Sequence, residues 1–298
     1  MYASFLVASG RIRRRRLSPA HFGGHVKVIA HRGASHQAPE NTLASVELAW
    51  RLGADAVEVD VHLTQDGRIV AIHDPTTDRT AGIHLEIATT HSSHLRRLDV
   101  GRYKHPRFAG ERIPYLEEVL QTVGPGRQLF VEIKCGPEIL PPLAETIAAS
   151  GKRSQIVLLG FDLDTMKAAK KMMPDVPAFW LCDKRLLTSY DRSIARKAKA
   201  GGVDGLDVHW SGITRRFIRT VKAAGLQLYI WTVDDPAQAV RLKAMGADGI
   251  TTNCPGRLKS CFTVPSRLGP SLQSPTGRRV RPCHPSRAPE ASPQDGRS

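Results

Sequence analysis

The sequence has 298 residues, of which 41% are hydrophobic and 24% charged, a composition ordinary for a soluble globular protein. The chain contains no apolar run approaching the roughly 20 residues of a membrane-spanning helix. The net charge of +15 comes mainly from the two ends of the chain, since residues 1–25 hold five Arg and no acid. Residues 26–258 are only mildly basic, which argues against a specific nucleic-acid partner.

The N-terminal segment and the cysteines bear on the compartment. Apolar residues precede RIRRRR in segment 1–25, the reverse of the order in a secretory signal. We expect a disordered leader there, with an organelle-targeting peptide as the alternative. The cysteines are odd in number and form no C-x-x-C pair: Cys135, Cys182, Cys254, Cys261 and Cys283. They indicate neither a disulfide framework nor a zinc site and fit a reducing, cytoplasmic compartment.

The first predicted unit is a strand followed by a helix. The apolar run 26–30 predicts a short buried strand, which ends at the string HRG beginning with His31. A helix is predicted over 43–52, with Asn41 or Thr42 as its N-cap.

The next units contain the first irregularity of the chain. Strand 56–62 is followed by a turn and by a hairpin partner over 68–72. Residues 75–113 show no clear period and are interpreted as an insertion. A helix over 116–123 and a strand over 128–134 then resume the alternation.

Beyond residue 134 helices and strands alternate regularly. The predicted helices are 140–149, 163–172, 190–200, 213–224, 236–245 and a remnant over 256–262. Glycines that suit a left-handed C′ position stand at helix ends: Gly151, Gly201, Gly225 and Gly246. The eight main strands are 26–30, 56–62, 128–134, 155–160, 177–182, 204–209, 226–232 and 248–252.

Eight strands separated mostly by helices favour the α/β class and a (β/α)₈ TIM barrel with a small insertion after the second strand. A doubly wound open sheet is the alternative. The barrel gathers polar residues from strand ends spread along the chain more naturally. The predicted domain covers 26–258, and segment 259–298, rich in Pro, Ser and Arg, is expected to be a disordered tail.

Three carboxylates occupy strands that look buried. Glu58 and Asp60 are two residues apart, so their side chains leave the same face of one strand. Glu132 and Lys134 repeat this arrangement on a later strand. Alternating apolar and charged residues also fit a half-exposed strand. Burying carboxylates without a partner is costly, however, and oxygen ligands suit Mg²⁺ or Ca²⁺, so we predict one divalent cation.

Further polar residues stand at the predicted strand ends. His31 and Arg32 follow the first strand, His73 follows the hairpin partner, and Trp231 lies on the seventh main strand. Active sites of such barrels form where strands end. A divalent cation with Arg32 and Lys134 would neutralise a phosphate, while two imidazoles would handle protons.

At these positions the chain resembles the glycerophosphodiester phosphodiesterases. The matching strings are HRGASHQAPENTLASVELAWRLGADAVEVDVHLTQDGRIVAIHDPTTDRT at 31–80, RIPYLEEVL at 112–120, FVEIK at 130–134 and YIWTVDDPAQAVRLKAMGADGITTNCPGRL at 229–258. The His-Arg-Gly, Pro-Glu-Asn-Thr, Glu-x-Asp, His-Asp, Glu-x-Lys and Trp-Thr-Val elements occur in order. Such a set is far more specific than one short motif.

The resemblance implies a function and a role for each site residue. It implies metal-dependent hydrolysis of a small-molecule glycerophosphodiester to sn-glycerol 3-phosphate and an alcohol. The implied roles are Glu58, Asp60 and Glu132 on one Mg²⁺ or Ca²⁺, His31 and His73 as acid and base, Arg32 and Lys134 on the phosphate, and Trp231 on the alcohol or glycerol side.

The chain departs from the family pattern at two positions. Asn253 stands where the family usually has Asp, and Gly160 stands where Ser is common. Neither position is a predicted metal ligand, so we expect activity to survive while substrate preference can change.

Other functions fit parts of the sequence. A lysophospholipase D or sphingomyelinase-like enzyme would need an apolar lip, for which segment 75–113 offers few large apolar residues. A non-catalytic barrel would not need the complete set of acids, His, Arg and Lys. A nucleic-acid binder would use the Arg-rich ends. The sequence does not indicate an oligomeric state.

Overall fold

The computed structural model describes residues 26–183 and 190–263, so the predicted leader and most of the predicted tail lie outside the described residues. Within these ranges one sheet follows the order β1-β9-β8-β7-β6-β5-β4-β2-β3, and an additional β1–β2 pairing closes it. The strands are β1 Lys27–His31, β2 Ala56–Leu63, β3 Ile69–Ala71, β4 Gln128–Ile133, β5 Ile156–Gly160, β6 Ala178–Cys182, β7 Gly205–His209, β8 Gln227–Trp231 and β9 Gly249–Thr252.

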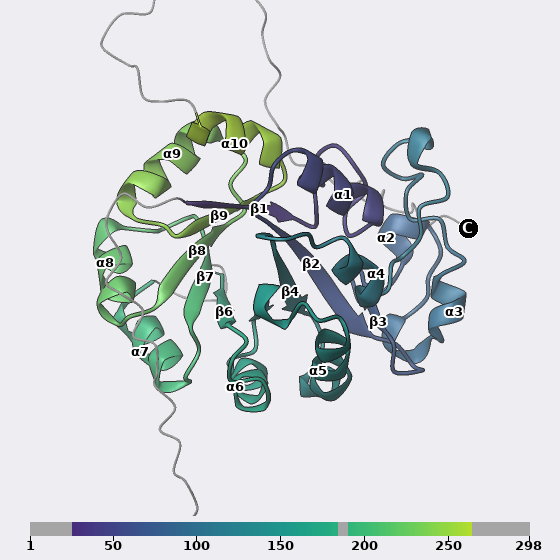
Figure 1. Ribbon diagram of the computed structural model, residues 1–298, viewed down its shortest axis with the longest axis horizontal. Helices are drawn as coiled ribbons and strands as arrows, with labels where there is room; N and C mark the ends of the chain where they lie inside the picture. The colour runs from purple at the N-terminus through teal and green to yellow at the C-terminus, as the bar shows by residue number, and fades with distance from the viewer. Residues whose placement is uncertain (1–25, 184–189, 264–298) are drawn as a thin grey trace, which may run out of the picture.

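The closed ring consists of parallel strands, while β3 pairs antiparallel with β2 as the predicted hairpin partner. Closure confirms the predicted (β/α)₈ barrel and excludes the open doubly wound sheet. Figure 1 shows helices surrounding the strands. The helices are α1 Leu43–Arg51, α2 Asp78–Ala81, α3 Ser92–Leu95, α4 Leu116–Gln121, α5 Leu140–Ala149, α6 Leu163–Met172, α7 Arg192–Ala200, α8 Arg215–Ala223, α9 Pro236–Met245 and α10 Pro255–Thr263. No described helix is both long and apolar enough to cross a bilayer.

Two apolar layers determine where the site can lie. One layer packs between the strands and the outer helices, and the other fills the barrel interior. In the interior layer Tyr229 stacks on Phe179 with ring centroids 4.8 Å apart and meets Phe130 at 5.3 Å. These rings pack the barrel interior, so polar residues that face inward gather at the carboxyl ends of the strands.

The first helix begins where the sequence suggested. Thr42 is the N-cap of α1, because its Oγ1 accepts a hydrogen bond from Ser45 N at 3.3 Å. Asn41, the other candidate, has a φ of 56° and bonds to Asp60 instead. Thr42 therefore caps the helix, whereas Asn41 binds a carboxylate inside the barrel.

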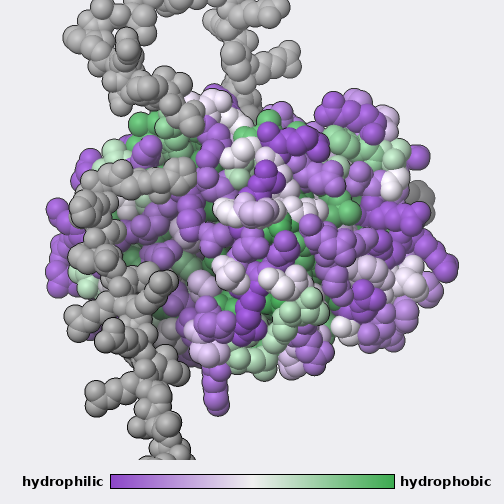
Figure 2. All heavy atoms as spheres, viewed as in Figure 1, coloured by the Kyte–Doolittle hydropathy of each residue, from purple (hydrophilic) through white to green (hydrophobic). Residues whose placement is uncertain are grey.

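The insertion between β3 and α4 has its own small core. Ile87, Leu95, Val100 and Ile113 are buried there against Val70 and Ile72 of the barrel side, with Leu85 and Leu98 partly buried. The short helices α2 and α3 lie beside the ring in Figure 1. Most of the large apolar residues of 75–113 therefore pack within the insertion. The face of the molecule seen in Figure 2 is largely hydrophilic.

One predicted left-handed glycine lies one residue away from its expected position. Gly151, Gly225 and Gly246 have positive φ values as predicted, whereas Gly201 is right-handed at −72°. Gly202 takes the left-handed position with a φ of 73°. Two consecutive glycines are equally permissive, so the sequence could not show which one reverses the chain.

Candidate active site

The three predicted carboxylates converge. Asp60 on β2 is in register with Glu132 on β4, and Glu58 lies two residues earlier on the same face of β2. One ligand oxygen from each residue lies within 4.8 Å of the others. Glu58, Asp60 and Glu132 are only 2%, 0% and 7% exposed. The strand register thus places three acids side by side inside the barrel.

This acidic cluster fits a divalent cation. Glu58 Oε1 and Asp60 Oδ1 are buried and have no hydrogen-bond partner among the described residues. Burial and the neighbouring Asp60 raise the pKa of Glu58 well above its usual value and that of Glu132 to about 7. Buried oxygens without donors and mutually repelling carboxylates are the conditions that a hard cation relieves.

Arg32 ties the end of β1 to this cluster. Its φ of 55° is left-handed, which is uncommon for a residue other than glycine. Its backbone N donates to Glu58 Oε2 at 2.9 Å, its Nε lies 3.1 Å from Asp60 Oδ2, and its Nη1 donates to Glu40 Oε1 at 2.9 Å. The unusual backbone conformation therefore lets one residue contact three acids.

Lys134 supplies a second cation from the end of β4. Its Nζ lies 2.9 Å from Glu132 Oε1 and 3.6 Å from Asp60 Oδ1. Burial alone would raise the pKa of Asp60, but Arg32, His73 and Lys134 hold it below the usual range. Arg32 and Lys134 thus place a positive charge on each of two sides of the acids, an arrangement that suits phosphate binding.

His31 is half-buried and has a defined orientation. Its Nδ1 lies 2.8 Å from Asn253 Oδ1, which also accepts from Ser35. Asn253 Nδ2 donates to Asp234 Oδ2 at 2.7 Å, so the amide oxygen is the atom that faces the ring. We therefore assign the Nδ1–H tautomer, with the lone pair on Nε2. Burial and Arg32 lower the pKa of His31 to about 4.

His73 has a carboxylate partner instead. Its Nδ1 lies 2.6 Å from Asp74 Oδ1, and Arg79 Nε donates to Asp74 Oδ2 at 2.6 Å. Burial lowers the pKa of His73, and Asp60 and Asp74 partly offset that effect. The two imidazoles thus differ: one faces a neutral amide, whereas the other faces a carboxylate that favours its charged form.

An aromatic wall lies across the barrel from the acids. Trp231 at the end of β8 donates from Nε1 to the carbonyl oxygen of Asp207 at 3.3 Å. Its ring lies 5.9 Å from that of Phe161 and 5.1 Å from that of His209, both edge to face. Lys134 Nζ is 5.8 Å from the Phe161 ring centroid, so the aromatic residues approach the acidic cluster at Lys134.

Two residues that the sequence did not suggest as site residues contact predicted site residues or their partners. Asn41 donates from Nδ2 to Asp60 Oδ2 at 2.9 Å and accepts from the Asp60 backbone N at 3.1 Å. Arg79 bridges Glu40 and Asp74. Asn41 belongs to the Pro-Glu-Asn-Thr string, which was a usable signal, but nothing local marked Arg79.

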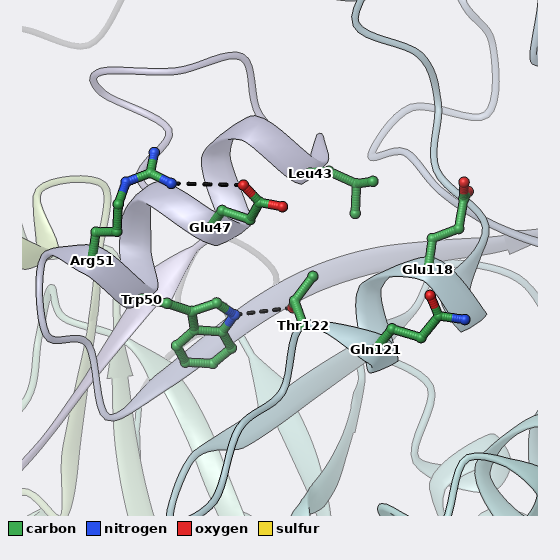
Figure 3. A pocket seen from close by; sticks show the side chains of 7 residues that line it. All are labelled: Leu43, Glu47, Trp50, Arg51, Glu118, Gln121 and Thr122. Atoms are coloured by element: carbon green, nitrogen blue, oxygen red, sulfur yellow. Dashed lines mark hydrogen bonds and ion pairs between the residues drawn. The ribbon is translucent and has the colours of Figure 1, made fainter.

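A groove on the outside of the barrel is a separate feature. It lies between α1 and α4, where Trp50 Nε1 donates to Thr122 Oγ1 at 3.0 Å (Figure 3). Its lining is Leu43, Glu47, Trp50, Arg51, Glu118, Gln121 and Thr122. It shares no residue with the predicted site and carries no comparable set of acids and imidazoles.

Known proteins of one family are similar to this chain. Residues 31–257 match the Glycerophosphoryl diester phosphodiesterase family. A glycerophosphodiester phosphodiesterase of Caldanaerobacter subterraneus subsp. tengcongensis is 34% identical over 78% of this chain and 95% of its own length. One from Bacillus subtilis is 28% identical over 77% of this chain and 84% of its own length.

A solved structure agrees with both. An Oleispira antarctica phosphodiesterase in complex with the product sn-glycerol-3-phosphate superposes with a TM-score of 0.75 and 28% identity. The match covers 80% of this chain and 97% of that one. The chain therefore belongs to the glycerophosphoryl diester phosphodiesterase family, and the enzyme class predicted from the sequence is confirmed.

Proposed function

We propose that the protein hydrolyses small glycerophosphodiesters to sn-glycerol 3-phosphate and an alcohol, with one Mg²⁺ or Ca²⁺. The observation that carries the proposal is the buried cluster of Glu58, Asp60 and Glu132, whose ligand oxygens lie within 4.8 Å. The product named for the Oleispira antarctica structure supports the same reaction.

Charge around the cluster suits a phosphodiester. Glu58, Asp60 and Glu132 would hold the cation, which when bound supplies positive charge that stabilises the phosphoryl oxygens. Arg32 and Lys134 border the same acids and contribute two more positive charges. They would orient the phosphate and balance the charge of its transition state.

The two histidines would divide the proton transfers. His31, kept neutral by its low pKa, presents Nε2 as an acceptor and takes the proton of the attacking oxygen. Attack by water gives sn-glycerol 3-phosphate directly. Attack by the glycerol 2-hydroxyl gives a cyclic phosphate, which water then opens to sn-glycerol 3-phosphate with the two histidines in reversed roles. His73 acts as the imidazolium, which the carboxylate of Asp74 at Nδ1 favours, and gives its Nε2 proton to the leaving alkoxide. Trp231 would line the alcohol or glycerol side of the pocket.

A lysophospholipase D or sphingomyelinase-like activity on lipid surfaces is less well supported. It would need a continuous apolar lip near the site. Ile87 and Leu95 of the insertion are buried, whereas Ile83 of the insertion and Phe161 beside the site are exposed. A cytoplasmic location stays a proposal that rests on the sequence, whose cysteines are odd in number and form no C-x-x-C pair.

A substrate and metal screen tests the proposal. The purified protein is assayed with glycerophosphocholine, glycerophosphoethanolamine and lysophosphatidylcholine, before and after chelation and with Mg²⁺ or Ca²⁺ added back. We expect turnover of the first two substrates, loss on chelation and recovery with a divalent cation. Replacing His73 by Ala should reduce the rate by about 10²–10⁴-fold, since an alkoxide leaves poorly without a proton. Near-normal turnover by both His31→Ala and His73→Ala would refute the assignment.

A further inference from the structure

Arg79, on α2 of the insertion, joins two carboxylates that belong to different parts of the chain. Its Nη1 and Nη2 each lie 2.8 Å from one oxygen of Glu40, a bidentate pair, and its Nε lies 2.6 Å from Asp74 Oδ2. A planar guanidinium can make all three bonds at once, whereas a lysine ammonium cannot reproduce that fork.

Each of these carboxylates in turn holds a group of the proposed active site. The second oxygen of Asp74 lies 2.6 Å from His73 Nδ1. Glu40 Oε1 accepts from Arg32 Nη1 at 2.9 Å. Charges therefore alternate along one chain of contacts from His73 through Asp74, Arg79 and Glu40 to Arg32.

This network differs from ordinary surface ion pairs, which contribute little. The side chain of Glu40 is only 16% exposed, and that of Asp74 is 28% exposed. By contrast, Arg102 in the same insertion is 75% exposed and lies 3.6 Å from Asp99. Without Arg79, the mostly buried Glu40 would keep only Arg32 as an ion-pair partner among the described residues. Asp74 would lose the hydrogen bond from Arg79 that fixes its orientation toward His73.

We propose that Arg79 is a positioning residue that orients His73 through Asp74 and Arg32 through Glu40. The inference rests on the proposed function, because it assigns His73 the proton transfer to the leaving alkoxide. It also gives the insertion a part in the chemistry.

Leaving-group chemistry separates positioning from a purely structural role. Arg79→Ala, Arg79→Lys and the control Arg102→Ala are compared on glycerophosphocholine and on the p-nitrophenyl ester of glycerol 3-phosphate. For Arg79→Ala we expect kcat/KM to fall about 10²-fold with the choline ester. The fall should be about tenfold with the p-nitrophenyl ester, because p-nitrophenolate leaves without a proton donor. Arg79→Lys should recover part of the loss, and Arg102→Ala should match the wild type.

Chemical rescue and melting complete the test. The Arg79 side chain is 38% exposed, so added guanidinium can reach the space left in Arg79→Ala and should restore part of its activity. Losses equal for both esters, unchanged activity, or a loss that follows a lower melting temperature without rescue would each overturn the inference. Wild-type turnover of glycerophosphocholine is measured first, so a failure of the proposed function itself would be recognised separately.

Discussion

His31 owes its orientation to a residue more than two hundred positions away in the chain. Asn253 presents its amide oxygen to His31 Nδ1 because Asp234 accepts from the amide nitrogen. An amide supports the neutral imidazole, while a carboxylate at the same place would support the cation. The departure from the family pattern at Asn253 therefore bears on proton transfer, although this residue touches none of the proposed metal ligands.

Exchanging the acid at 234 and the amide at 253 tests whether the amide keeps His31 neutral. The double substitution Asp234→Asn with Asn253→Asp keeps one acid and one amide side by side but turns a carboxylate toward His31. His31, as a base, is active when neutral, so its pKa of about 4 predicts an acidic limb of kcat/KM near that pH. The double variant should raise the pKa of His31 and move this limb up by about 1–3 pH units. The control Asp234→Asn alone should leave it in place; an equal shift in both variants would contradict the account.

Some site residues could be read from the sequence and others could not. Glu58 and Asp60 were identifiable because side chains two apart on a strand share a face. Arg79 and Asn253 were not assigned roles, because each has a partner far away in the chain, Glu40 for Arg79 and His31 for Asn253, that only the folded chain brings close. The predicted carboxylate cluster needed the register of β2 and β4, which alternation along one strand does not define.

Among the elements, the loop from β1 to α1 does the most to arrange the site. Within it, Gly33 has a φ of 80°, and a Cβ added there would lie 2.5 Å from the carbonyl carbon of Ser45 in α1. Ser45 Oγ in turn donates to the carbonyl oxygen of Arg32 at 2.9 Å. The close approach of loop and helix therefore supports the unusual backbone of Arg32.

Two alanine substitutions separate packing from backbone strain. Gly67, in the β2–β3 turn, has a similar φ of 74° but open space around it. Gly67→Ala should lower the free energy of unfolding by about 1 kcal/mol through strain alone. Gly33→Ala should cost about 2–4 kcal/mol because the overlap with Ser45 is added. Urea unfolding of both variants checks this, and equal losses would show that the contact with α1 is unimportant.

The order and type of the elements were more predictable than their ends. Long apolar runs and regular helical patterns placed the eight main strands within about a residue or two of the observed bounds, as expected for strongly periodic segments. The left-handed glycine after α7 was misplaced because Gly201 and Gly202 are adjacent. The insertion resisted prediction, since its short helices α2 and α3 depend on packing against the barrel rather than on their own period.

For the molecule as a whole, ionisation of Glu132 opposes folding when no cation is bound. Glu132 has a native pKa of about 7 and an ordinary value of 4.5. The native state therefore holds this proton more tightly than the unfolded state does. The resulting stability is fully present below pH 4.5 and is lost as the pH rises through about 7, a change on the order of 3 kcal/mol.

Glu132→Gln isolates this effect. In chelator, the variant should become more stable relative to the wild type as the pH is raised from 4.5 to 8, because Gln does not ionise. Adding Mg²⁺ or Ca²⁺ at pH 8 should raise the melting temperature of the wild type by mass action and that of the variant much less. Glu145→Gln, on the exposed side of α5, is the control and should differ from the wild type by the same amount at both pH values. If the stability difference between Glu132→Gln and the wild type is the same at pH 4.5 and pH 8, ionised Glu132 is not destabilised by its acidic neighbours. The argument for a cation among the three acids would then lose its physical basis.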